Sequence, residues 1–319
     1  MLLEMLEYMR PEGSEAQKEF CERFLEPLMG KPDAHGNYTL IIGDKPRVSF
    51  MAHHDTVHRV GGKQKLELTS DNLIFSDANC LGADCTTGVW LITEMIKAKI
   101  EGVYVVHAGE EIGCKGSSAL VKERPAWIKH VDAAISFDRK GMSSIITHQM
   151  GMRTASEAFS KSFAEAVNLD MVSDDGGSYT DSNEYAYVIS ECTNISVGYY
   201  NQHTKNEYQD LDFAYILRDA LIQADWSKLV FKRDPSVLEY ADYYGNATSS
   251  FRRFTSDYFW NSSSRTGPLA DLADAVADYP ETVAAILHEL GYDAYDILDA
   301  AEAREIAERD YWVFRYANL

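Results

Sequence analysis

The stretch Val48-Ser49-Phe50-Met51-Ala52-His53-His54-Asp55-Thr56-Val57 joins a mostly apolar run to a polar cluster. A strand is predicted over 48–53, and residues two apart in a strand point to the same side. His53 and Asp55 would therefore lie together, as a metal-bound imidazole and its carboxylate partner often do. His54 is expected to pack or be exposed on the opposite side, and His58 to lie in a solvated loop. By itself, a His-x-Asp pair is weak evidence for a metal site.

Short apolar runs alternate with amphipathic runs up to about residue 232. Further strands are predicted over 38–42, 103–107, 133–137, 145–147 and 195–197, and helices over 86–99, 116–124, 154–167 and 211–231. Another helix is predicted from the capping box Ser14-Glu15-Ala16-Gln17 to Gly30. Buried strands separated by helices predict an α/β fold with a mixed, mostly parallel sheet covered by helices on both faces.

The composition changes after residue 233. Residues 234–319 contain 16 Asp or Glu, six Arg and no Lys, which gives a net charge of −10. Helices are predicted over 280–291 and 294–316, because apolar residues recur there at helical spacing. The chain is therefore predicted to divide into an α/β domain over 1–233 and an acidic helical domain or extension over 234–319.

The overall charge narrows the range of partners. The 319 residues include 30 Lys and Arg against 50 Asp and Glu, so the net charge is −20. Such a surplus repels phosphate and disfavours nucleic acids and anionic membranes. No stretch reaches the 18 or more apolar residues of a membrane span. Five cysteines without a CxxC pair predict reduced thiols and a cytoplasmic location, and the acidic N-terminal residues do not resemble a secretory leader.

A second polar cluster, Leu81-Gly82-Ala83-Asp84-Cys85-Thr86-Thr87-Gly88, lies at the start of the helix predicted over 86–99. The glycines allow a tight turn. Taken alone, Asp84 is more typical of a helix N-cap than of a metal ligand. We interpret Cys85 as a buried, inert thiol and not as a nucleophile, since the sequence requires no histidine beside it.

Two adjacent acids, Glu110 and Glu111, follow the strand predicted over 103–107. Two carboxylates side by side disfavour joint ionisation when they are buried. A cation beside one of them removes that penalty, so one carboxylate could serve as a ligand and its neighbour as a base. A solvated loop is the alternative for this pair taken alone.

Two more polar residues complete a series. Asp138 ends the strand predicted over 133–137, and His203 lies in the loop that follows 195–197. Each signal is weak alone, but binding sites in open α/β sheets form beyond the carboxyl ends of the strands. Two imidazoles and three carboxylates suit two divalent ions that share one carboxylate.

In this order the residues resemble the co-catalytic dizinc exopeptidase superfamily, which includes peptidase T, the carboxypeptidase G type, and glutamyl and bacterial leucyl aminopeptidases. The resemblance implies the zinc exopeptidase fold and two divalent metal ions, zinc being expected and manganese or cobalt being alternatives. The implied ligands are His53 and Asp138 for the first ion, Glu111 and His203 for the second, and Asp84 as the bridge between them. Asp55 would orient His53, and Glu110 would be the general base.

The sequence also departs from the family pattern. Members often have Asp and Lys after the bridging aspartate, where this chain has Cys85 and Thr86. The resemblance further implies a cis peptide bond between Asp84 and Cys85. Only 65 positions separate Asp138 from His203, too few for an inserted lid domain, so the chain resembles the single-domain aminopeptidase branch.

The segment Gly176-Gly177-Ser178-Tyr179-Thr180-Asp181 resembles a loop found near the site in some aminopeptidases of this group. Thr180 and Asp181 are therefore candidate substrate-binding residues, with a plain turn as the alternative.

The resemblance implies a metallo-exopeptidase, in particular an aminopeptidase, that hydrolyses small peptides through a water activated by two metal ions. A homo-oligomer is compatible with it. One alternative is an amidohydrolase that deacylates N-acyl amino acids with the same two ions. Another is an inactive, metal-stabilised binding protein whose acidic tail contacts a partner.

Overall fold

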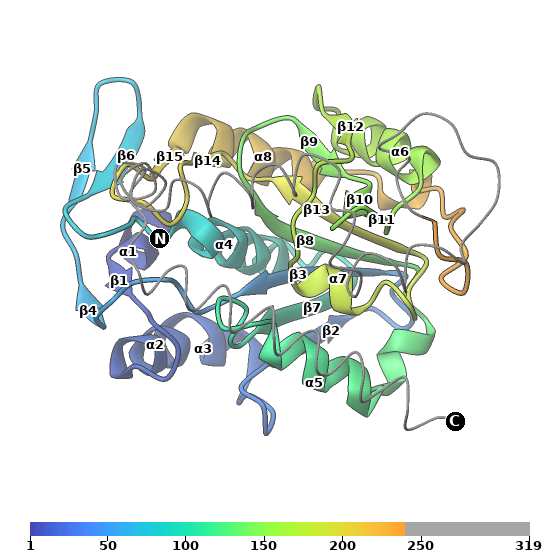
Figure 1. The fold of residues 1–319 in the computed structure, drawn as a ribbon, viewed down its shortest axis with the longest axis horizontal. Coiled ribbons are helices and arrows are strands. Elements are labelled where there is room, and N and C mark those ends of the chain that lie inside the picture. Colours follow the sequence, from blue (N-terminus) through green and yellow to red (C-terminus); the bar gives the residue numbers. More distant parts are fainter. Residues whose placement is uncertain (240–319) are drawn as a thin grey trace, which may run out of the picture. The chain divides into compact units, whose positions relative to one another are not determined.

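A seven-stranded mixed sheet forms the centre of the computed structural model, which describes residues 1–239 (Figure 1). The strand order is β12-β9-β13-β8-β3-β7-β2. The bounds are β2 Tyr38–Ile42, β3 Val48–His53, β7 Gly102–His107, β8 Ala133–Arg139, β9 Ser144–Ile146, β12 Val172–Asp174 and β13 Glu191–Ser196. The four adjacent strands β13, β8, β3 and β7 run parallel. Their carboxyl ends therefore meet at one edge of the sheet.

The central strands are buried on both faces, which explains why their sequences are almost continuously apolar. All six residues of β3 are buried. Phe50 and Ala52 pack into one apolar cluster, whereas Met51, between them, packs into a second cluster on the other face. This alternation follows from the two-residue period of a strand.

Helices cover each of these faces (Figure 1). On the first face α4 (Ala83–Lys97) packs against β3 and β8 and contacts α1 (Leu2–Leu6) and α8 (Leu211–Gln223), and α8 contacts α6 (Glu157–Val167). On the second face α7 (Asp181–Glu184) packs against β3, β8 and β13 and contacts α5 (Lys115–Glu123). The predicted α/β architecture, a mostly parallel sheet between two layers of helices, is confirmed.

The predicted N-terminal helix is present with one irregularity. Helices α2 (Glu15–Phe20) and α3 (Glu26–Met29) are joined without a break by a π-helical segment, Cys21–Leu25. The Ser14 hydroxyl accepts a hydrogen bond from the Gln17 amide at 3.1 Å. The helix ends at Gly30, whose positive φ of 83° is the conformation that glycine adopts most readily.

The helix predicted over 211–231 is too long. Helix α8 ends at Gln223, and Ala224 is extended. The Asp225 carboxylate then accepts the Ser227 amide, which starts a short 3₁₀ turn, Trp226–Lys228. A local side-chain bond of this kind competes with helix continuation.

Several short strands were not predicted from the sequence. A four-stranded antiparallel sheet has the order β14-β15-β6-β5, with bounds Tyr199–Tyr200, Tyr208–Asp210, Leu73–Ser76 and Leu66–Leu68. Strand β1 (Tyr8–Met9) pairs with β4 (Gly62–Lys63), and β10 (His148–Gln149) pairs with β11 (Met152–Arg153). Another 3₁₀ turn covers Ala126–Lys129. The β14–β15 hairpin matters most, because its loop carries His203.

The predicted helices at 280–291 and 294–316 lie outside the described residues, as does almost all of the acidic segment. The boundary at residue 233 therefore stays a prediction. Within residues 1–239, no helix combines the length and apolar character that crossing a bilayer requires. All five cysteines are buried and unpaired, as the sequence predicts for reduced thiols.

Candidate metal centre

Parallel strands bring the predicted polar residues to one edge of the sheet. His53 is the last residue of β3, and Asp138 lies near the end of β8. Glu110 and Glu111 follow the adjacent strand β7 after a tight turn at Gly109, which has a positive φ of 65°. Residues that are up to 85 positions apart in the sequence therefore lie side by side.

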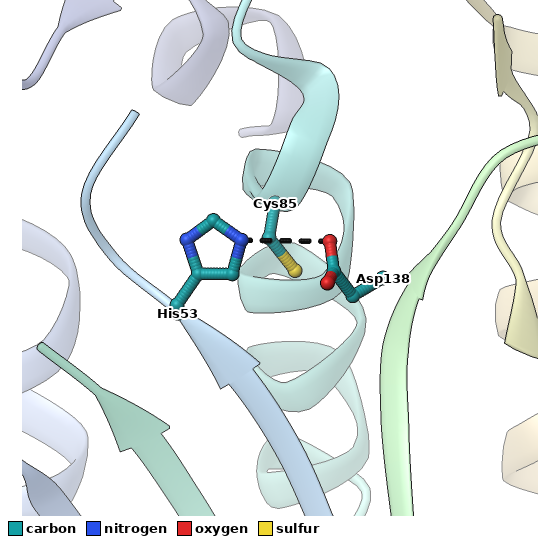
Figure 2. A group of neighbouring side chains, drawn as sticks. All are labelled: His53, Cys85 and Asp138. Atoms are coloured by element: carbon teal, nitrogen blue, oxygen red, sulfur yellow. Dashed lines mark ion pairs between the residues drawn. The ribbon is translucent and has the colours of Figure 1, made fainter. Parts of the chain in front are cut away.

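Figure 2 shows the first cluster, in which His53 and Asp138 face each other across the first residues of α4. The His53 Nε2 atom lies 3.4 Å from Asp138 Oδ1, and both side chains are almost fully buried. The Cys85 sulfur is close by, and the three candidate ligand atoms lie within 4.8 Å of one another.

Asp84 connects this cluster with a second one. Its Oδ1 atom lies 3.2 Å from His53 Nε2, and its Oδ2 atom lies 3.2 Å from His203 Nε2. Glu111 Oε1 is also 3.2 Å from His203 Nε2. The two oxygens of one carboxylate therefore face two different imidazoles, which is the arrangement expected of a bridging ligand. The Asp84 carboxylate is directed at these two imidazoles, so Asp84 does not serve as a side-chain N-cap of α4.

Asp55 contacts both His53 and the turn that carries Glu110 and Glu111. Its main-chain oxygen lies 3.1 Å from His53 Nδ1, and its Oδ1 atom lies 3.4 Å from the same nitrogen. Its carboxylate also accepts the main-chain N–H groups of Glu110 and Glu111, at 3.1 and 3.0 Å. Asp55 thus contacts both the His53 ring and the turn that carries the two glutamates, as the predicted orienting role requires.

The donor set fits a cation. Burial raises the pKa of Glu110, Glu111 and Asp138, because ionised carboxylates are disfavoured away from water. Glu111 Oε1 and Asp138 Oδ1 are buried, and their contacts with the two histidines lack hydrogen-bond geometry. Imidazole nitrogens and carboxylate oxygens are among the ligands that zinc prefers, and here they converge on one buried site.

Cys85 is buried, as the sequence predicts. Its thiol donates a hydrogen bond to the main-chain oxygen of Phe137 at 3.0 Å, and burial raises the pKa of the thiol well above its usual value. The protonated form is the unreactive one. The peptide bond between Asp84 and Cys85 is cis, as the family resemblance implies.

Replacing Cys85 by Ala tests whether this thiol is only a packing group. We expect the C85A variant to lose about 0.5–3 kcal/mol of stability, because a small buried group is removed, and to keep its full zinc content. Thermal unfolding and metal analysis by mass spectrometry measure the two effects. C192A is the matched control, since Cys192 is a buried thiol in the second apolar cluster. Loss of zinc in C85A alone would contradict the prediction and identify the sulfur as a ligand.

The candidate substrate residues lie beside the centre, at the start of α7. The Thr180 hydroxyl donates to Asp138 Oδ2 at 2.8 Å, so this residue positions a candidate ligand. Asp181 is only 1% exposed, and neither carboxylate oxygen accepts a hydrogen bond with good geometry from the described residues. Burial raises the pKa of Asp181 to about 7. Direct contact of either residue with a substrate stays a prediction.

Of two further histidines, His58 departs from its prediction and His54 follows it. His58 was expected in a solvated loop, and this is wrong: the residue is 3% exposed. Its ring contacts the Thr56 hydroxyl, the Gln64 amide oxygen and the main-chain oxygen of Cys80. His54 packs on the side of the strand away from the centre, beside Tyr38, as expected.

Two charged residues around the centre were not predicted from the sequence. Arg10 is fully buried and donates to the main-chain oxygen of His54 and to the Thr86 hydroxyl, both at 2.8 Å. Glu207 is also buried, and its carboxylate accepts main-chain N–H groups at the start of α4. The only signal for Glu207 was its place four residues after His203. Arg10 had no signal, because its partners are distant in the sequence.

Comparison with known proteins gives one family and a set of similar folds. The model of peptidase family M28 matches residues 37–185. The fold is similar to that of aminopeptidase PepT from Bacillus cereus, with a TM-score of 0.56 and 16% identity over 70% of this chain and 95% of that one. A tripeptidase from Staphylococcus aureus gives 0.57 and 15%, with coverages of 70% and 95%. A TET aminopeptidase from a Thaumarchaeota archaeon gives 0.55 and 13%, with coverages of 70% and 94%. No curated protein matches significantly.

The family match covers every predicted site residue except His203. For His203 the support comes from geometry, since its ring contacts both Asp84 and Glu111. At identities of 13–17%, the structural similarities establish the fold and not the reaction.

Proposed function

We propose that this protein is a metal-dependent peptidase of the co-catalytic zinc exopeptidase superfamily, and in particular an aminopeptidase that uses two metal ions to hydrolyse small peptides. The observation that carries the proposal is the position of Asp84, whose two carboxylate oxygens lie 3.2 Å from His53 and from His203. Two imidazoles on opposite oxygens of one carboxylate favour a pair of ions.

In this proposal the ligands divide as the family pattern implies. His53 and Asp138 would hold the first ion, Glu111 and His203 the second, and Asp84 both. When bound, the two ions, zinc or alternatively manganese or cobalt, would supply Lewis acidity for the scissile carbonyl and lower the pKa of a water molecule. The buried oxygens of Glu111 and Asp138 without hydrogen bonds support this division.

Glu110 is the proposed general base. Its side chain is 13% exposed, so it borders the space where a substrate would lie, and its Oε2 atom is 4.0 Å from His53 Nε2. Glu110 would take a proton from the attacking water and later deliver it to the leaving amine. Its main-chain N–H group is bound by Asp55, so the side chain projects from a fixed turn.

Proteins of similar fold and the negative charge of the chain both support a peptide substrate. Proteins of similar fold are named as aminopeptidases and a tripeptidase. The acidic character of the chain suits the positively charged N-terminus of a peptide. Thr180 and Asp181 would form part of the substrate-binding loop.

The remaining features are inferred more broadly. A homo-oligomer is supported by a neighbour of similar fold that is described as assembling into a tetrahedron or an octahedral shell. The five unpaired cysteines support a cytoplasmic location. The catalytic domain would span residues 1–233, followed by an acidic helical domain or extension over 234–319.

A substrate panel tests the proposal. The purified full chain, loaded in turn with zinc, manganese or cobalt, is offered aminoacyl anilides, short peptides and N-acyl amino acids. We expect metal-dependent release of the N-terminal residue and no turnover of the acylated compounds. Turnover of the N-acyl amino acids instead would assign the deacylase reaction. The absence of turnover with every metal would favour a metal-stabilised binding protein.

A further inference from the structure

Glu207 makes an unusual set of contacts at the start of helix α4. Its Oε2 atom accepts the main-chain N–H groups of Leu81 and Gly82, both at 3.0 Å. Its Oε1 atom accepts those of Ala83 and Asp84, at 2.8 and 3.2 Å. One carboxylate thus binds four consecutive main-chain donors, from a position more than 120 residues away. Glu207 is 1% exposed, so water does not compete for these bonds.

The turn at residues 81–84 depends on these contacts, because no side chain within the turn accepts its main-chain N–H groups. Gly82 occupies the N-cap position and has no side chain to accept the free N–H groups of the first turn. Asp84 has non-helical backbone angles, with φ −75° and ψ 106°. Its carboxylate points toward the histidines and is not available for capping. Glu207 is therefore the group that satisfies this turn.

The same residue is tied to the loop that carries His203. Both lie between β14 and β15, and the Glu207 amide donates to the Thr204 main-chain oxygen at 3.0 Å. Gln209, in β15, accepts a hydrogen bond from the Thr87 hydroxyl of α4. Strand β15 also pairs with β6, so the hairpin is held on two sides.

We propose that Glu207 is a positioning residue that fixes Asp84 and His203 relative to each other and so builds the second metal position. The inference rests on the two-metal function proposed above and goes beyond it. Without this clamp, nothing else among residues 1–239 bonds the 81–84 turn directly to the 201–207 loop, except the contact of His203 with Asp84 itself. His203 is 45% exposed, so packing alone does not hold its side chain.

The structure offers a matched control at the opposite edge of the sheet. Glu191 begins β13 and is fully buried, and its carboxylate accepts the main-chain N–H groups of Ser156, Lys232 and Arg233. It has the same chemistry as Glu207 and joins distant segments, but none of its partners is a candidate ligand. A general loss of stability should therefore be similar in variants of the two residues.

The test is zinc titration of the metal-free full chain by calorimetry, for wild type, E207Q and E191Q. In E207Q an amide nitrogen faces two N–H donors in place of an acceptor, which breaks half of the clamp. We expect E207Q to weaken the second zinc by about 10–100-fold, the range found when a residue that supports a ligand is removed. The first zinc, and both zincs in E191Q, should bind as in wild type. The variant H203A identifies which step is the second zinc.

Several outcomes would overturn the positioning role of Glu207. Two wild-type zinc affinities in E207Q, or an equal loss in E191Q, would mean that Glu207 only stabilises the fold. If E207Q lowers zinc affinity further in the H203A background, Glu207 does not act through the second metal position. If E207Q does not fold, E207D, which keeps the charge and shortens the reach, is measured in its place. Failure of wild type to bind two zincs would instead refute the proposed function.

Discussion

Replacing Glu110 by Gln is expected to lower kcat by about 10²–10⁴-fold, the contribution typical of a general base. The amide has nearly the same size as the carboxylate but cannot accept the proton of the attacking water. Glu110 is not among the proposed ligands, and its turn is held through main-chain bonds to Asp55, which the substitution leaves in place. We therefore expect E110Q to fold normally and to retain both metal ions.

Steady-state kinetics on an aminoacyl anilide, together with metal analysis of the same sample, measure both effects. E123Q is a suitable control, because Glu123 is exposed at the end of α5 and pairs, within residues 1–239, only with His35. A near-normal kcat in E110Q would refute its assignment as the base. Loss of metal from E110Q would show that it acts as a ligand.

Replacing Asp84 by Asn is expected to remove metal ions, in contrast to E110Q. An amide nitrogen has no lone pair for a metal ion, so one of the two imidazole-facing positions loses its ligand and the bridge loses its charge. We expect zinc affinity to fall by more than about 100-fold at one position or both, because removal of a group that only supports a ligand already costs about 10–100-fold. Activity should fall with the metal content.

Metal analysis after dialysis against a chelator measures this loss, and circular dichroism checks that the fold is retained. D132N is the control, since Asp132 pairs with Arg47 just before β8, at the edge of the sheet away from the centre. Wild-type zinc content in D84N would refute the bridging assignment. The contrast between D84N and E110Q separates the ligand role from the proton-transfer role.

Much of the sheet could be predicted because its strands are buried on both faces. Strands β2 and β3 have the predicted bounds, and β7 begins one residue earlier than predicted. Runs of apolar residues such as these are visible without any tertiary information. The short strands of the second sheet were missed for the converse reason: strands of two to four residues carry no clear period. Strands β15 and β6, whose pairing joins the two hairpins of this sheet, are also more than 130 residues apart in the sequence.

The candidate ligands could be predicted from order and position, because each follows an apolar strand or begins a helix. What the sequence could not indicate was which groups hold these ligands in place. Arg10 and Glu207 contact the 81–86 segment from far along the chain. His58 was misjudged because the turn after β3, which has a polar sequence, is covered by Gln64 and the 80–82 segment.

The sequence by itself determined which residues end at the carboxyl edge of a parallel sheet, since apolar runs define the strands and polar residues follow them. Only the tertiary structure decided how those side chains are oriented: that Asp84 turns one oxygen to each histidine, and that Glu207 holds its backbone. The physical reason is the distance along the sequence over which each property is determined. Strand burial is read from neighbouring residues, whereas ligand orientation depends on hydrogen bonds between segments that meet only after folding.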